Sequence, residues 1–123
     1  MAVSGGERVL VLDSEILIAM EVAQMLEDAL QCTALAASWL TFDAGQAADP
    51  GFDAIVMDCE YVPDAIAEAL SRPPFDRVAR VYLTTGSQVG CGIPPEGVPT
   101  VEKPIATDML VDAVQGVLLP RVA

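Results

Sequence analysis

Short apolar runs alternate with amphipathic stretches along the whole chain. Five apolar runs bounded by polar or turn-forming residues have the length and composition of buried strands. They span residues 8–12, 32–38, 53–58, 77–85 and 98–102. Apolar residues at spacings of three and four predict helices over 14–30, 63–71 and 107–119, and a short helix over 41–49. The pattern therefore indicates strands that alternate with helices.

The ends and faces of these helices also follow from the sequence. Ser14 is expected to cap the first helix, Pro63 to open the next long one, and Thr107 to cap the last. The expected buried side of the first helix is Ile18, Val22, Met25 and Ala29, opposite a polar stripe of Glu21, Gln24, Glu27 and Asp28. The expected buried side of the last helix is Leu110, Val111, Val114, Val117 and Leu118.

Alternation of strand and helix predicts an α/β fold with a doubly wound, five-stranded parallel sheet. A flavodoxin-like strand order of 2-1-3-4-5 suits this pattern. The connection over residues 86–97 is rich in glycine and proline, so the helix between strands four and five is expected to be short or missing. Residues 1–123 form one predicted domain, and no fused output domain is visible.

Composition narrows the function classes. The chain has 123 residues, of which 53% are hydrophobic, and its 18 acidic against 6 basic residues give a net charge of -12. This charge argues against nucleic-acid binding and favours a cationic partner or a metal ion. The absence of histidine excludes a histidine-based triad and disfavours a zinc site. Three widely spaced cysteines suit reduced thiols, and no apolar run spans a bilayer, so we expect a cytoplasmic location.

Polar residues end four of the predicted strands. Strand one ends at Asp13, strand three at Asp58, strand four at Thr84 and Thr85, and strand five at Lys103. Ligands of open parallel sheets bind at the carboxyl ends of the strands, so these groups are expected to share one cleft. Two close carboxylates repel unless a cation joins them, and Mg²⁺ prefers such oxygen ligands. An ionised aspartate is also a nucleophile toward phosphorus.

Four segments with these residues, "RVLVLDSEILIAMEV", "FDAIVMD", "LTTG" and "VEKP", resemble the receiver domains of two-component response regulators. The resemblance implies that Asp58 accepts the phosphoryl group. It implies that Thr85 and Lys103 bind phosphoryl oxygens, with Thr84 as the alternative threonine. Mg²⁺ would then be held by Asp13, Asp58 and the backbone carbonyl of Glu60. The segment before "VEKP" is similar to an alphaproteobacterial receiver group with a short fourth helix, the "FAT GUY" type.

The sequence departs from the family pattern at three places. Ser14 stands where the family usually has a second acidic residue that binds the metal, which weakens the expected Mg²⁺ site. Glu15 is one position too late for a simple replacement. Pro63 follows the acceptor one residue later than usual, and Thr100 replaces a frequent switch aromatic.

The resemblance implies a stand-alone response regulator that is phosphorylated by a histidine kinase or a histidine phosphotransfer protein. It would signal through a downstream protein partner, without nucleic acid or membrane, and would not be an enzyme beyond its own phosphotransfer and autodephosphorylation. The alternative is a degenerate pseudo-receiver that binds proteins without phosphorylation, as Ser14 suggests. A small phosphatase or dehalogenase-like hydrolase is a weaker alternative, because Glu60 replaces the second aspartate that such enzymes usually carry. The kinase, target, stimulus and oligomeric state do not follow from the sequence.

Overall fold

The computed structural model describes residues 6–43, 51–58, 62–73, 75–84, 98–102 and 105–118. The described strands are β1 (Arg8–Asp13), β2 (Thr33–Ser38), β3 (Ala54–Asp58), β4 (Ala79–Thr84) and β5 (Thr100–Glu102). The described helices are α1 (Ile16–Leu30), α3 (Asp64–Leu70), the 3₁₀ helix η1 (Phe75–Arg77) and α4 (Thr107–Leu118). Of these helices, none is long and apolar enough to cross a membrane.

The five strands form one parallel sheet in the order β2-β1-β3-β4-β5. The predicted α/β class, strand number and strand order are therefore confirmed. All five carboxyl ends lie at one edge of the sheet, because every pairing is parallel. The strand order reverses between β1 and β3, which places a topological switch point between these two central strands.

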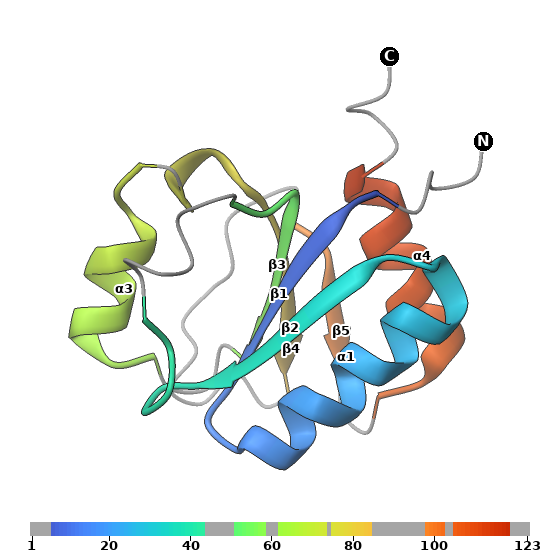
Figure 1. Ribbon diagram of the computed structural model, residues 1–123, viewed down its shortest axis with the longest axis horizontal. Helices are drawn as coiled ribbons and strands as arrows, with labels where there is room; N and C mark the ends of the chain where they lie inside the picture. The colour runs from blue at the N-terminus through green and yellow to red at the C-terminus, as the bar shows by residue number, and fades with distance from the viewer. Residues whose placement is uncertain are drawn as a thin grey trace.

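The described helices lie on both faces of the sheet (Figure 1). Helices α1 and α4 pack side by side on one face, and α3 with η1 lies on the other. Alternate residues of each strand serve the two faces. In β1, Val9 and Val11 join the core under α1 and α4, whereas Leu10 and Leu12 join the core on the α3 side.

Helix α1 begins two residues later than predicted. It starts at Ile16, and Glu15 holds the cap position without a side-chain hydrogen bond, so the prediction that Ser14 caps this helix is wrong. The predicted burial of Ala29 is also wrong, since this residue is exposed. The buried residues of α1 are Ala19, Val22, Ala23, Leu26 and Leu30, with Ile18 and Met25 partly buried against the same core.

The reason for this shift lies in the length of the turn after β1. Residues 14 and 15 form a bend, so the first helical turn begins at Ile16. The residues that face the sheet then follow the series 19, 22, 23, 26 and 30, in which small alanines alternate with larger side chains. Ala29 falls outside this series and faces solvent.

The other helix predictions are mostly confirmed in position. Helix α3 starts at Asp64, with Pro63 at the cap position. In α4, Leu110, Val114 and Leu118 are buried, and Val111 and Val117 pack against them. Thr107 is the first helical residue and not the cap, because the N–H of Leu110 donates to the carbonyl of Ala106. The predicted helix over 41–49 and the connection over 86–97 lie largely outside the described residues.

Strand β2 forms an edge of the sheet, and side chains of the same chain protect it. The N–H of Ala34 donates to the Glu27 carboxylate at 3.0 Å, and the N–H of Ser38 donates to the Thr41 hydroxyl at 2.8 Å. Edge strands with unpaired backbone groups pair readily with other chains. Glu27, which the sequence pattern assigns to a solvated stripe, therefore has a structural role at this edge.

Candidate functional site

Two buried aspartates end the central strands on either side of the switch point. Asp13 is the last residue of β1 and Asp58 the last residue of β3, and their exposed fractions are 0% and 1%. The register pairs Val9 with Ala54 and Leu12 with Met57. The same register sets Asp13 beside Asp58, as the sequence predicted for neighbouring strands in this order.

Both aspartates follow the alternation of the strand face under α1 and α4. Asp13 comes two residues after Val11, and Asp58 two residues after Val56, and both valines belong to the core under these helices. Two acidic side chains therefore lie on the same side of the sheet and at the same edge. Two buried carboxylates on adjacent strand ends repel each other when both are ionised. A cation or hydrogen bonds to their oxygens would have to offset this repulsion and the loss of hydration.

Ser14 lies between the two carboxylates. Its hydroxyl oxygen is 3.4 Å from Oδ1 of Asp13 and 3.5 Å from Oδ2 of Asp58. Both distances exceed the usual length of an O–H···O hydrogen bond, and one hydroxyl proton is donated to one carboxylate at a time. The structure thus places Ser14 at the site as a neutral neighbour of both acids.

Asp13 also holds the turn that leads into α1. Its Oδ1 accepts a hydrogen bond from the N–H of Glu15 at 3.0 Å. Asp13 therefore has a structural role in the turn before the first helix, and its role in a functional site stays a prediction. A hydrogen bond from a backbone N–H fixes the orientation of the carboxylate that accepts it.

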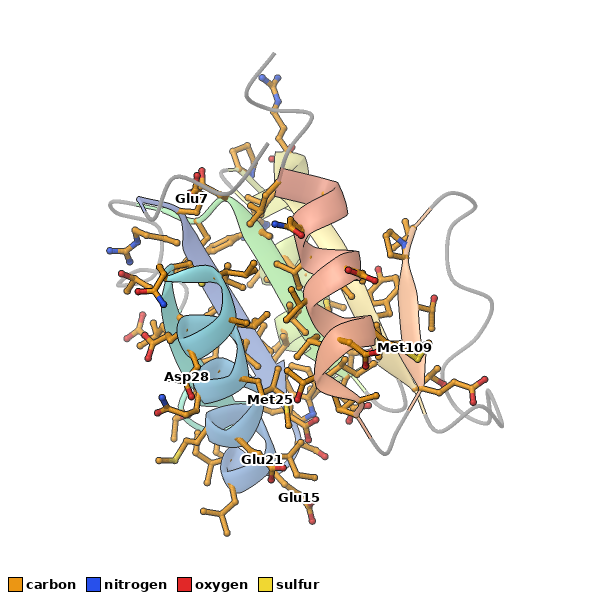
Figure 2. The ribbon with its side chains drawn as sticks, turned by 90° about the vertical axis from the view of Figure 1, so that its right-hand side faces the viewer. Glu7, Glu15, Glu21, Met25, Asp28 and Met109 are labelled. Atoms are coloured by element: carbon orange, nitrogen blue, oxygen red, sulfur yellow. The ribbon has the colours of Figure 1, made fainter. Side chains whose placement is uncertain are left out.

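Glu15 does not bring its carboxylate into this site. Its side chain is exposed, and Figure 2 shows it at the end of α1, directed away from the strands. In the part of the chain that the structure describes, no three acidic or cysteine side chains are grouped closely enough to hold a metal ion. The described donors at the site are thus the two carboxylates and the Ser14 hydroxyl.

Thr84 is buried at the end of β4 and pairs in register with Glu102 of β5. Its alternation follows that of Tyr82, which packs against the core on the α3 side. Leu83, in contrast, belongs to the core under α1 and α4. Thr84 therefore differs in strand face from Asp58. The other three predicted site residues, Glu60, Thr85 and Lys103, lie outside the described residues.

The donor chemistry at the site fits a hard divalent cation. Two carboxylates at the ends of adjacent strands supply charged oxygen ligands, and a cation between them would remove their mutual repulsion. Replacement of an acidic residue by Ser14 leaves one charge fewer than three carboxylates would supply. The geometry is therefore compatible with Mg²⁺, and binding of Mg²⁺ stays a prediction.

Sequence reasoning missed one buried polar residue near this site. Ser38 ends β2 and pairs in register with Asp13. Its hydroxyl accepts a hydrogen bond from the N–H of Leu40 at 3.2 Å and lies 3.3 Å from the Thr41 hydroxyl. The signal was present in the sequence, because Ser38 is a polar residue after an apolar run, like Asp13 and Asp58. Its hydrogen bonds show that it organises the turn after β2.

No family model and no curated protein matches the chain. Solved structures do match. The chemotaxis protein CheY4 of Vibrio cholerae is 23% identical, with a TM-score of 0.67 over 92% of this chain and 99% of CheY4. A response regulator receiver protein of Sinorhizobium medicae is 21% identical, with a TM-score of 0.65 over 94% of this chain and 97% of that protein.

The anti-anti-sigma factor PhyR of Bartonella quintana is 21% identical, with a TM-score of 0.68 over 95% of this chain and 49% of PhyR. The same fold occurs in proteins assigned to pilus assembly in Burkholderia pseudomallei and Burkholderia thailandensis. At these identities the likeness concerns the fold. The comparisons do not confirm the predicted "FAT GUY" subgroup. The chain has the receiver-domain fold of response regulators.

Proposed function

We propose that this chain is a phosphorylatable receiver that takes a phosphoryl group from a phosphohistidine onto Asp58. The observation that carries the proposal is the pair of buried aspartates at the switch point, Asp13 and Asp58, on adjacent strand ends. Two carboxylates in this position supply a nucleophile and a second negative group to hold a cation. The receiver fold supports the proposal, since the comparisons include a response regulator receiver protein.

In the proposed reaction, a carboxylate oxygen of Asp58 attacks the phosphorus of the donor. A new P–O bond forms an acyl phosphate while the P–N bond of the phosphohistidine breaks, and the freed imidazole takes up a proton. The Ser14 hydroxyl is the neutral donor nearest to the attacking group, 3.5 Å from Asp58 Oδ2, and it would have to move closer to form a hydrogen bond of usual length there. Asp13 is oriented by the Glu15 N–H and contributes negative charge toward a cation.

The remaining roles in the proposal come from the resemblance. Mg²⁺ on Asp13, Asp58 and the Glu60 carbonyl would neutralise charge on the transferred phosphoryl group. Lys103 and a threonine would bind phosphoryl oxygens. Thr84 belongs to the other strand face, so Thr85 stays the preferred threonine.

We further propose that the chain works in the cytoplasm as a signalling protein, and not as an enzyme that turns over a separate substrate. It would receive the phosphoryl group from a histidine kinase or a histidine phosphotransfer protein and pass the signal to a protein. PhyR, which shares this fold, is an anti-anti-sigma factor, which supports a protein as the downstream partner.

The test is phosphorylation of the purified chain. Incubation with Mg²⁺ and acetyl phosphate or phosphoramidate should give a single acyl phosphate that hydroxylamine removes and that intact-mass measurement detects. Asp58→Asn should abolish the product, whereas Asp76→Asn, a matched change at an exposed aspartate of η1, should retain it. Absence of a Mg²⁺-dependent acyl phosphate with small-molecule donors and with phosphorylated kinase or phosphotransfer proteins would refute the proposal.

The second candidate is a pseudo-receiver that binds a protein without phosphorylation. Ser14 favours it, because this site holds two described carboxylates and a neutral hydroxyl. A titration with Mg²⁺ distinguishes the two functions. Trp39 directly follows β2, whose end pairs with Asp13, so its fluorescence should report on the site. Saturable binding that Asp13→Asn removes supports the receiver, and no saturable binding supports the pseudo-receiver.

A further inference from the structure

Ser14 places a hydroxyl beside the carboxylate that the proposed function phosphorylates. Its Oγ lies 3.5 Å from Oδ2 of Asp58 and 3.4 Å from Oδ1 of Asp13. Both aspartates are buried, whereas Ser14 is exposed and lies in the bend before α1. In the proposed phosphorylation of Asp58, this hydroxyl forms no covalent bond.

The surroundings of Ser14 are those of an activated hydroxyl. A serine hydroxyl is a weak nucleophile until a neighbouring base accepts its proton. The Asp13 carboxylate lies within reach of the hydroxyl, and the N–H of Glu15 holds that carboxylate in place at 3.0 Å. Ser14 therefore has an oriented proton acceptor on one side and the proposed site of phosphorylation on the other.

The distance between Ser14 and Asp58 suits the transfer of a group from one oxygen to the other. A phosphoryl group passes in line between an entering and a leaving oxygen on opposite sides of the phosphorus. Reacting atoms that are ready to combine lie about 3 to 3.5 Å apart. The hydroxyl starts 3.5 Å from a carboxylate oxygen of Asp58. Because the Ser14 side chain is exposed, it can change its rotamer to approach the phosphorus without displacing the core.

We propose that Ser14 is a second phosphoryl acceptor, which takes the group from the acyl phosphate on Asp58. The Ser14 oxygen forms a new P–O bond, the P–O bond to the Asp58 carboxylate breaks, and the hydroxyl proton passes to Asp13. The products are a phosphoserine and a free Asp58 carboxylate, and no further reactant is consumed. The transfer runs toward the phosphoserine, because a carboxylate, the anion of a much stronger acid than an alcohol, is the better leaving group.

The inference rests on the proposed function, because the acyl phosphate on Asp58 is the donor. An acyl phosphate is hydrolysed readily in water, whereas a serine phosphate is a stable ester. The transfer would therefore turn a transient modification into a lasting one. The phosphate on Ser14 would carry a charge of about −1.5 to −2 two residues before the start of α1, where the helix N-terminus favours negative charge.

The test follows the phosphate after the donor has been removed. The purified full chain is phosphorylated with Mg²⁺ and phosphoramidate, desalted rapidly, and sampled over time. Because no donor is left, phosphate that then appears on Ser14 comes from Asp58. The hydroxylamine-labile acyl phosphate should fall while hydroxylamine-resistant phosphate rises at least about fivefold, and peptide mass spectrometry should place the resistant phosphate on Ser14. Dilution of the protein should not change the rate, since the transfer occurs within one chain.

Variants separate this transfer from direct phosphorylation of serine. Per acyl phosphate formed, Ser14→Ala should lose the resistant phosphate, and Ser14→Thr, which keeps a hydroxyl, should retain it. Ser71→Ala, a matched change at an exposed serine after α3, should behave like the parent chain.

Three outcomes would each overturn the inference. They are an acyl phosphate that decays in the parent chain without a phosphoserine, equal resistant phosphate in Ser14→Ala, and phosphorylation of Ser14 that persists in Asp58→Asn. The first of these leaves the proposed function intact. If no acyl phosphate forms under any donor, the proposed function fails and the inference fails with it.

Discussion

The two faces of the sheet bury their strands by different means. On one face, two helices of 15 and 12 residues pack against aliphatic side chains. On the other, the helices that the structure describes are α3, with 7 residues, and the short 3₁₀ helix η1, and aromatic rings pack there beside them. Phe42 and Phe75 meet edge to face with their centroids 5.8 Å apart, and the Arg8 guanidinium lies 4.9 Å from the centre of the Phe52 ring.

The two faces also differ in the polar and charged groups that they carry. Large rings and arginine stems cover much surface per residue, so a few of them bury strand residues next to the short helices described on this face. That face also holds the four described arginines. The two aspartates of the candidate site and the acids of α1 belong to the other face. The proposed site thus lies on the face that the two long helices cover.

The largest expected effect compares one leucine from each face. Leu26 of α1 and Leu70 of α3 are both fully buried. Leu26→Ala should destabilise the chain by about 3 to 5 kcal/mol, because α1 packs against β1, β2 and α4, and these elements cannot move in to close the cavity. Leu70→Ala should cost about 2 to 3 kcal/mol, because the short α3 can move inward. Urea unfolding followed by circular dichroism measures both.

The comparison fails if Leu70→Ala is the more damaging of the two. That outcome would mean that the thin layer of α3 and η1 is as rigidly packed as the helical face. Leu17, an exposed leucine of α1, provides the control for helix propensity. Leu17→Ala should change stability by less than about 0.5 kcal/mol.

A smaller effect is expected at the protected edge of β2. Glu27→Ala should destabilise the chain by about 1 to 2 kcal/mol, because it removes the carboxylate that accepts the Ala34 N–H. Glu21→Ala on the same helix is the matched control and should have almost no effect, since Glu21 is exposed. Thermal unfolding gives the stabilities. Equal losses in the two variants would show that Glu27 acts only through the charge of the helix.

Sequence patterns predicted the sheet well because its central strands are short, continuous apolar runs, as buried strands are. β1 and β3 are buried along nearly their whole length, which makes their apolar runs unambiguous. The helix ends were less predictable. Ser14 and Thr107 are both good capping residues by type, yet one lies in the bend before α1 and the other within α4. Local preference is weak against the geometry of the turn that the sheet imposes.

At the candidate site, the sequence predicted which residues end the strands but not how they contact one another. The pairing of Asp13 and Asp58 followed from strand order alone. The position of Ser14 between them depends on the bend of residues 14 and 15, and the roles of Glu27 and Ser38 depend on contacts between separate elements. Such contacts leave no periodic signal in one sequence.

A third prediction concerns the charge at the candidate site. Ser14→Asp adds a carboxylate within reach of Asp13 and Asp58, so the variant should lose about 1 kcal/mol of stability when EDTA is present. Added Mg²⁺ should restore the lost stability. It should bind to the variant at least tenfold more tightly than to the parent chain. Unfolding curves with and without Mg²⁺ measure both quantities. Ser14→Asn, which adds the shape without the charge, should do neither.

The smallest expected effect is a change of stability with pH that arises from the buried thiol of Cys32, in the core under α1 and α4. Burial raises the pKa of the Cys32 thiol above its ordinary value of 9.0, and the nearby charges of Glu27 and Glu7 add to this shift. The thiol donates to the carbonyl of Leu26 at 3.7 Å. Because the unfolded thiol ionises first, the stability present below about pH 9 should decline as the pH rises through this value.

The decline should be seen between about pH 8 and about pH 10, on the alkaline side of the unfolded thiol's pKa. Unfolding in urea is measured in a background with Cys59→Ser and Cys91→Ser, where Cys32 is the single thiol. Adding Cys32→Ala should remove this part of the pH dependence, because alanine has no proton to lose. If the two proteins decline equally, Cys32 is ionised as easily in the folded chain as in the unfolded one, and the core under α1 is more open to water than its burial indicates.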